Sequence, residues 1–144
     1  MRLCGVTLHS IAATLVYFAR MQEALPHEVN DRLAKERNVW IVTVRRDGRP
    51  HMVPVWFVWF ESKIYVCIEP ESVKGRNILL NRNVTLALED GSHPVICEGH
   101  AGVVEKPWPA PVARMFDEKY DWEILADLRY TQLVEITPRR WLYW

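Results

Sequence analysis

The chain has 144 residues, of which 49% are hydrophobic and 25% are charged, a balance typical of one globular domain rather than a disordered chain. Eighteen basic and eighteen acidic residues give a formal net charge of zero, so no overall field favours DNA, RNA or an anionic membrane surface. Three cysteines without a Cys-x-x-Cys motif argue against a disulfide framework and favour free thiols in a reducing cytoplasm.

Residues 1–25 are predicted to form an N-terminal extension that is peripheral to a single domain spanning residues 26–144. The apolar stretch at 3–18 is interrupted by polar residues and falls short of the about 18–20 apolar residues that span a bilayer, so no membrane segment is expected. Met21 begins a sequence that resembles a natural protein start, and a miscalled start codon would explain the residues before it. A docked amphipathic helix and a signal peptide are the alternatives.

The domain alternates short apolar stretches with turn signals, which predicts a mainly β fold. Residues 51–60 are apolar at nearly every position after His51, so we expect one strand with both faces covered. Pro54 places that strand at an edge or a bulge, Gly99 indicates a bend, and Pro138 is expected to end the last strand. The predicted strands are 39–44, 51–60, 64–68, 84–88, 94–104 and 133–137.

Three short helices are expected at 26–37, 71–81 and 110–122. The strands are mostly joined by hairpins, as the Asp47-Gly48 turn signal illustrates. Antiparallel strands of this number close most economically into a small barrel. The sequence therefore predicts a mainly β protein with a six-stranded antiparallel barrel.

The segment 71–77 is predicted to open a helix that can bind an anion. Unpaired N–H groups and the positive end of the helix dipole favour a phosphate at such a position. Ser72 can cap the helix, Lys74 and Arg76 add positive charge, and Gly75 would let a ligand approach the backbone. The alternative is a capped surface helix whose basic side chains are only solvated.

No arrangement of a nucleophile and a base is recognisable in the sequence. Cys97 and His100 have the spacing of a metal pair, but residues three apart on a strand point to opposite faces, so no metal site is expected. The acidic residues near the end of the helix at 110–122 are interpreted as a solvated face. If the chain is an enzyme, a cofactor would supply the reactivity.

Three segments in succession resemble the pyridoxamine 5′-phosphate oxidase-like family of flavin- and deazaflavin-binding proteins. They are Asp-Gly-Arg-Pro-His-Met-Val-Pro-Val-Trp-Phe at 47–57, Ser-x-Lys-x-Arg-Asn at 72–77, and Asn-Val-Thr-Leu-Ala-Leu-Glu-Asp-Gly at 83–91. The likeness covers about residues 30 to 137. It implies a six-stranded antiparallel split β-barrel of the FMN-binding type, which forms a homodimer with cofactor sites at its interface.

The resemblance also implies which residues contact the cofactor. The matching positions are His51, Val53, Pro54, Val55 and Trp56 along the flavin ring, and Ser72, Lys74, Arg76 and Asn77 at the phosphate. Trp141, together with Arg139 and Arg140, is a candidate contact from the partner subunit by its position near the C-terminus. For any one residue of the strand, the alternative is a packing role in the barrel or dimer core. No catalytic residue is identified.

The function expected from the resemblance is an FMN-dependent oxidoreductase that transfers hydride between the flavin and a small organic substrate. Counterparts of the vitamin B6 oxidase's substrate-phosphate residues are not found near the C-terminus, so pyridoxamine phosphate is not the expected substrate. A reductase dependent on coenzyme F420, whose longer tail is more acidic, is the near alternative. A non-catalytic flavin-binding or carrier protein and a structural dimer are alternatives of other classes.

Overall fold

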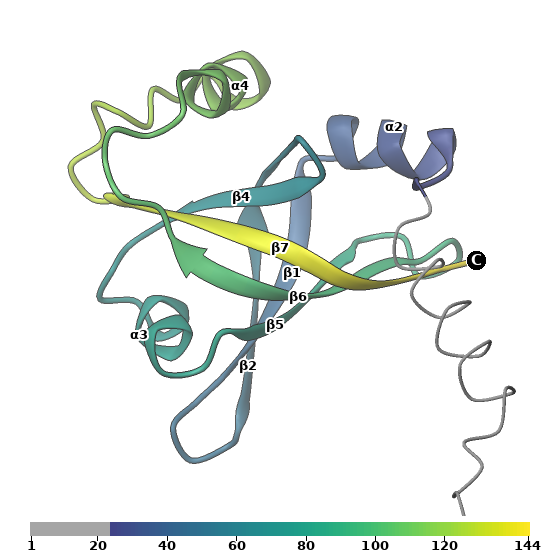
Figure 1. The fold of residues 1–144 in the computed structure, drawn as a ribbon, viewed down its shortest axis with the longest axis horizontal. Helices are drawn as coiled ribbons and strands as arrows, with labels where there is room; N and C mark the ends of the chain where they lie inside the picture. Colours follow the sequence, from purple (N-terminus) through teal and green to yellow (C-terminus); the bar gives the residue numbers. More distant parts are fainter. Residues whose placement is uncertain (1–23) are drawn as a thin grey trace, which may run out of the picture.

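The computed structural model describes residues 24–144, which form mainly β-structure with a helix at three places along the chain (Figure 1). Residues 1–23 of the predicted N-terminal extension lie outside the described residues. The elements are α2 (His27–Lys35), β1 (Asn38–Val44), β2 (Pro50–Trp56), β3 (Val58–Phe60), β4 (Lys63–Ile68), α3 (Val73–Leu80), β5 (Asn83–Leu88), β6 (Val95–Val103), α4 (Ala110–Tyr120) and β7 (Gln132–Tyr143). The predicted mainly β class is confirmed.

The strands form one antiparallel sheet in the order β2-β1-β5-β6-β7-β4-β3. Its two edge strands, β2 and β3, are joined by a single residue, Phe57. Because one residue cannot bridge the width of a flat seven-stranded sheet, the sheet must curl until its two edges meet. The resulting curled sheet is open between β2 and β4, which approach each other without pairing.

The prediction of six strands was wrong for the described residues, which form seven. The stretch predicted as one strand at 51–60 is interrupted at Phe57, and its two parts pair with different strands. The first part pairs with β1 and the second with β4, at opposite edges of the sheet. The edge position that Pro54 predicted for β2 is confirmed.

Helix α4 satisfies the backbone at this interruption. The Phe57 N–H donates to the Tyr120 hydroxyl oxygen at 2.9 Å, and the hydroxyl lies 2.6 Å from the Phe57 carbonyl oxygen. Lys119 Nζ also donates to that carbonyl at 3.1 Å. Burial lowers the pKa of Lys119 to about 8, with a further contribution from the nearby Arg37. The helix thus supplies the partners that a continuous ladder would have given.

The last strand continues beyond the proline that was predicted to end it. β7 runs through Pro138, which lies opposite Gly99 at a bulge between Glu98 and Gly99. A proline is tolerated there because the ladder is already irregular. A Cβ on Gly99 would lie 2.8 Å from the Thr137 carbonyl oxygen. The predicted bend at Gly99 is therefore confirmed, and the basic-aromatic tail is the end of a strand.

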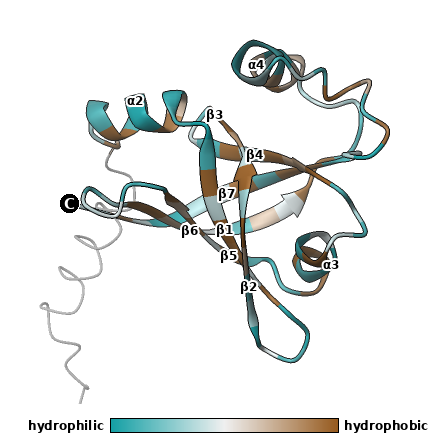
Figure 2. Cartoon of the chain, turned by 180° about the vertical axis from the view of Figure 1, so that it is seen from behind, coloured by the Kyte–Doolittle hydropathy of each residue, from teal (hydrophilic) through white to brown (hydrophobic). Residues whose placement is uncertain are grey.

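The main core lies inside the curled sheet, where every second residue of β1, β5 and β6 is buried. Five consecutive residues of β4 are buried because a second cluster, which includes Val112 and Phe116 of α4, covers its other face. Figure 2 shows hydrophobic residues concentrated along the strands and hydrophilic residues along α2 and at the β1–β2 turn. Gly48 in that turn has a φ of 88°, as the Asp-Gly signal predicts. α3 packs against β1 and β6, whereas α2 and α4 both pack against β3.

The three predicted helices are confirmed with small changes at their ends. α2 and α3 lie within the predicted stretches, and α4 ends two residues early, where Asp121 adopts a left-handed conformation with a φ of 54°. Among the described residues, no helix is long and apolar enough to cross a membrane.

Candidate functional site

The predicted opening of a helix at Ser72 is present and is capped as expected. Ser72 Oγ accepts from the Gly75 N–H at 3.2 Å and donates to the Glu69 carbonyl oxygen at 2.7 Å. No acceptor for the N–H groups of Val73 and Lys74 is found within residues 24–144. The first turn of α3 therefore offers free donors and the positive end of the helix dipole.

Three basic side chains lie close together beside this turn, and we call Arg45, His51 and Lys74 the cationic cluster. Arg45 Nη2 lies 3.1 Å from His51 Nδ1. Lys74, on the first turn of α3, is near enough to act on the charge of His51. The three residues come from the end of β1, the start of β2 and the start of α3, which the fold brings to one place.

The surroundings of His51 and Lys74 in the cluster disfavour their protonated forms. Burial lowers the pKa of His51, and the charges of Arg45 and Lys74 lower it further. Burial also lowers the pKa of Lys74, against which the Glu69 carboxylate acts in the opposite direction. Partly buried cations without a bound counter-charge are costly, and an anion would relieve that cost. The arrangement is suited to a phosphate group.

A buried hydrogen bond holds α3 next to the cluster. Asn77 Nδ2 donates to Thr43 Oγ1 at 2.9 Å, and both side chains are buried. Thr43 lies opposite His51 in the β1–β2 pair, so this bond sets the distance between α3 and the start of β2. The side chain of Asn77 is thus used inside the fold, and its predicted contact with a cofactor stays a prediction.

The five predicted residues of β2 lie on two faces of the strand. His51, Val53 and Val55 lie opposite the buried Thr43, Ile41 and Val39, on the inner face. Pro54 and Trp56 are on the outer face and exposed. The far side of β2 is an edge, where backbone N–H and C=O groups are left without a strand partner.

Trp56 is held by α4 at the end of β2 opposite the cationic cluster. Its ring stacks on Tyr120 with centroids 4.7 Å apart and an interplanar angle of 11°. The edge of Trp122 meets it at 5.7 Å. Since β2 rises about 3.3 Å per residue, Trp56 is roughly 16 Å along the strand from His51.

The remaining predicted residues have different surroundings. Arg76 is exposed, and it is two residues from Lys74, which places the two side chains about 200° apart around the helix axis. Trp141 packs edge-on against Trp59 of its own chain, with centroids 5.7 Å apart. A Cβ on Gly75 would lie 2.4 Å from the Pro70 carbonyl oxygen. The space at Gly75 is therefore filled by the preceding turn and is not open to a ligand, contrary to the expectation.

Arg45 was not among the predicted site residues. Its position directly before an Asp-Gly hairpin offered a signal, because residues on either side of a tight turn are brought together. No local pattern indicated that its guanidinium would contact His51.

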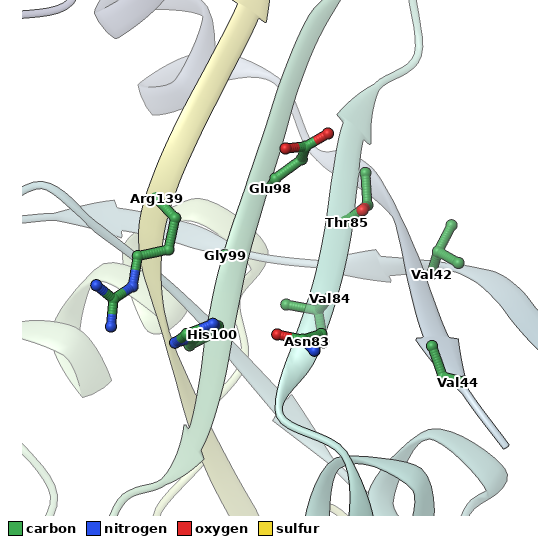
Figure 3. A pocket seen from close by; sticks show the side chains of 9 residues that line it. All are labelled: Val42, Val44, Asn83, Val84, Thr85, Glu98, Gly99, His100 and Arg139. Atoms are coloured by element: carbon green, nitrogen blue, oxygen red, sulfur yellow. The ribbon is translucent and has the colours of Figure 1, made fainter. Parts of the chain in front are cut away.

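A cavity of about 350 Å³ lies elsewhere, on the outer face of the sheet. Figure 3 shows its side chains on β1, β5, β6 and β7. The bulge places Arg139 over the cavity near His100, while Cys97 is buried on the opposite face, as the spacing predicted. The lining residues are Val42, Val44, Asn83, Val84, Thr85, Glu98, Gly99, His100 and Arg139.

The cavity and the cationic cluster are separate candidates, and we favour the cluster as the anion site. Glu98 lies in the cavity, 3.9 Å from Arg140, so its charges are mixed. The cluster combines three basic side chains with free helix donors and the open edge of β2. Among the described residues, no group of three or more potential metal ligands is found.

Comparisons with known proteins bear on the family and the fold of the chain. The sequence profile of the family described as pyridoxamine 5′-phosphate oxidase matches residues 25–144. No protein of curated function matches the chain. An F420 reductase is similar in structure, with 20% identity, a TM-score of 0.67, and coverage of 82% of this chain and 98% of that one.

Two further structures are similar at the level of the fold. HutZ, the heme storage protein from Vibrio cholerae, has 19% identity and a TM-score of 0.70, covering 84% of this chain and 95% of its own. General Stress Protein 26 from Bacillus anthracis has 21% identity and a TM-score of 0.59, covering 81% and 96%. The curled seven-stranded sheet fits the split-barrel architecture of this group.

Proposed function

The chain belongs to the pyridoxamine 5′-phosphate oxidase family, and on that premise we propose that it is an FMN-dependent oxidoreductase acting on a small organic substrate. The observation that carries the proposal is the cationic cluster beside the first turn of α3, next to the open edge of β2. Bound FMN would supply the flavin ring that accepts and donates hydride.

The residues present fit a phosphorylated flavin in two respects. Lys74, His51 and the free N–H groups of α3 suit a phosphate, because charged and backbone donors together bind anions well. Along the open edge of β2, the N–H and C=O of Met52 and the C=O of Pro54 point away from β1 and suit the polar edge of a flat ring, since such an edge carries both donors and acceptors. In this proposal the protein binds and orients the cofactor, and no residue is assigned to proton transfer.

The absorbance spectrum of the freshly purified protein tests the proposal. A flavin spectrum, or saturable binding of added FMN, is the expected result. Reduction of the bound flavin by NADPH or NADH, followed by turnover of an acceptor, would separate an enzyme from a carrier. A colourless protein that binds neither FMN nor F420 would contradict the cofactor proposal.

The anchoring role of Lys74 can be measured by substitution. Lys74→Ala should weaken FMN binding by about 1.5–3 kcal/mol, roughly tenfold to a hundredfold in Kd, because a charge-assisted contact is lost. Fluorescence titration with FMN provides the measurement. Arg76→Ala is the matched comparison: both were predicted to hold the phosphate, but Arg76 points away from Lys74.

A smaller effect of Arg76→Ala would restrict the phosphate site to the cationic cluster. An effect equal to that of Lys74→Ala would extend the site along α3. Unchanged affinity for FMN in both single variants and in the double variant would mean that the phosphate binds at another place in the protein.

The second candidate cofactor is coenzyme F420. Arg45 adds a cation that the sequence did not identify, and the more acidic tail of F420 would use additional positive charge. Competition between FMN and F420 for the protein decides between them. Hemin belongs in the same titration because HutZ is a heme storage protein, and a Soret band in place of flavin binding would favour a heme-binding role.

We also propose that the protein is a homodimer that covers the outer face of the sheet. Apolar side chains cross this face in register, from Pro54 through Trp40, Ala87 and Ile96 to Leu142. Most are only half-buried in the single chain, and an apolar row of this kind is typical of a surface that a partner covers. The same face carries the cavity near Arg139.

The cytoplasmic location stays a prediction. Cys67 and Cys97 are buried free thiols, and burial raises the pKa of each to about 12. Such thiols are unreactive and pack as small apolar side chains.

A further inference from the structure

The contact between Arg45 and His51 fixes the protonation state of the histidine ring. Arg45 Nη2 lies 3.1 Å from His51 Nδ1. A guanidinium carries only donors, so the ring nitrogen that faces it must be the acceptor. The proton of a neutral imidazole is then on the other nitrogen, Nε2, which becomes a donor.

The surroundings of His51 oppose a second proton. Arg45 approaches from the end of β1 and Lys74 from the first turn of α3, and both are cationic. Opposite His51 on β1 is Thr43, which is neutral and already bonded to Asn77. A proton on Nδ1 would point at the guanidinium and would break the hydrogen bond to Arg45, the only one that the His51 ring makes among residues 24–144.

We propose that Arg45 is a positioning residue for the cofactor, which holds His51 in the neutral Nε2–H tautomer so that this N–H donates to the phosphate. The inference rests on the proposed function, because it assigns the ligand of Nε2 as the phosphate of FMN or of a similar cofactor. It separates two cationic roles in the cluster. Lys74 supplies charge, and Arg45 supplies orientation.

One consequence is that His51 binds the phosphate as a neutral donor. Binding then needs no proton uptake by the ring, and affinity should not depend on protonation of a histidine near neutral pH. Without Arg45, the ring would be free to exchange tautomers and to take up a proton beside a phosphate dianion.

The tautomer can be measured directly on the full-length protein without a cofactor. Long-range ¹H–¹⁵N correlation spectra of protein labelled at histidine distinguish a protonated from an unprotonated ring nitrogen. His51 is assigned with His51→Gln. We expect Nδ1 of His51 to be unprotonated and Nε2 protonated at neutral pH. In Arg45→Met we expect averaged tautomers and a His51 pKa that is higher than in the wild type, although burial and Lys74 still lower it.

The matched control is Arg46→Met. Arg46 is the neighbouring arginine, is exposed, and makes no hydrogen bond or ion pair within the described part of the chain. This variant removes the same charge from the same turn and should leave the His51 signals unchanged. Equal changes in Arg45→Met and Arg46→Met would show a general charge effect and would overturn the positioning role.

A double-mutant cycle tests whether Arg45 acts through His51. The amide N–H of a glutamine at position 51 can donate from a site near that of Nε2. It does so without a hydrogen bond from Arg45 to fix a tautomer. Arg45→Met should weaken FMN binding about tenfold in the wild-type background and less than twofold in the His51→Gln background. Equal losses in both backgrounds would mean that Arg45 contacts the phosphate directly.

The two proposals fail in different ways. If the tautomer is as expected but the protein binds neither FMN nor F420, the proposed function is wrong while the Arg45–His51 coupling stands. If FMN binds but Nδ1 of His51 is protonated, the positioning role is wrong while the proposed function stands.

Discussion

At the scale of single residues, close packing decides the role of Gly75 more than its conformational freedom does. It lies in the middle of the first turns of α3, where a glycine normally weakens a helix. The Pro70 carbonyl oxygen occupies the place where a Cβ would be, at 2.4 Å, and the Glu69 carbonyl oxygen is 2.8 Å away. The turn before α3 can therefore fold tightly against the first turn of the helix, which carries Lys74.

Gly75→Ala should destabilise the protein and weaken FMN binding together. The methyl group would have to displace backbone atoms, and that cost should exceed the about 1 kcal/mol by which alanine favours a helix. Urea unfolding and FMN titration measure the two effects. Gly91→Ala is the control, since a Cβ there meets nothing within 4 Å. If Gly75→Ala is more stable than wild type, the turn is not packed as described.

At the scale of elements, α4 keeps the two halves of the long apolar stretch in separate strands. The break at Phe57 leaves its N–H and its carbonyl oxygen without a strand partner, and the Tyr120 hydroxyl is within hydrogen-bonding distance of both. The hydroxyl also lies 2.8 Å from the carbonyl oxygen of Arg37, the residue before β1. Burial raises the pKa of Tyr120 to about 12, so the hydroxyl keeps its proton at neutral pH.

Tyr120→Phe should lower the free energy of unfolding by about 1–3 kcal/mol, because it leaves the buried Phe57 N–H without an acceptor. The phenylalanine ring can still stack on Trp56 in this variant. The measured loss therefore reports the hydroxyl group alone. Chemical denaturation measures the loss. Tyr130→Phe serves as the control, since its hydroxyl has no hydrogen bond within residues 24–144. Equal stability of the two variants would mean that another group satisfies Phe57.

At the scale of the whole molecule, the curled sheet has an inner face that the chain fills by itself and an outer face that it leaves partly bare. The inner face holds one continuous core. The outer face of β1, β5 and β6 carries the apolar row and the cavity. A stable interface buries about 800 Å² of surface on each partner. We place the proposed dimer interface on this outer face of β1, β5 and β6.

Ile96→Arg should convert the proposed dimer into a monomer, because it puts a charge in the middle of the apolar row without disturbing the inner core. Sedimentation or light scattering gives the mass, and far-ultraviolet circular dichroism checks the fold. Leu79→Arg is the matched control, since Leu79 is 66% exposed on α3. A wild-type protein that is monomeric at micromolar concentration would contradict the proposed dimer.

The sequence by itself determined the features that depend on neighbours within one or two turns of chain. The cap at Ser72, the hairpin turn at Gly48 and the bend at Gly99 were all predicted from local patterns. Each follows from the conformational preferences or hydrogen-bonding groups of a few adjacent residues. The resemblance to the family was carried by such segments, and the family match supports it.

Only the tertiary structure decided where the long apolar stretch breaks and what meets at the cationic cluster. A break at Phe57 is invisible locally because both halves have strand-forming residues, and their separation comes from pairing with β1 and β4. Arg45 and His51 meet because a hairpin folds them together, and Lys74 joins them only when α3 docks through the Asn77–Thr43 bond. Contacts between distant segments depend on how the whole sheet curls, and that is set by the packing of all its strands at once.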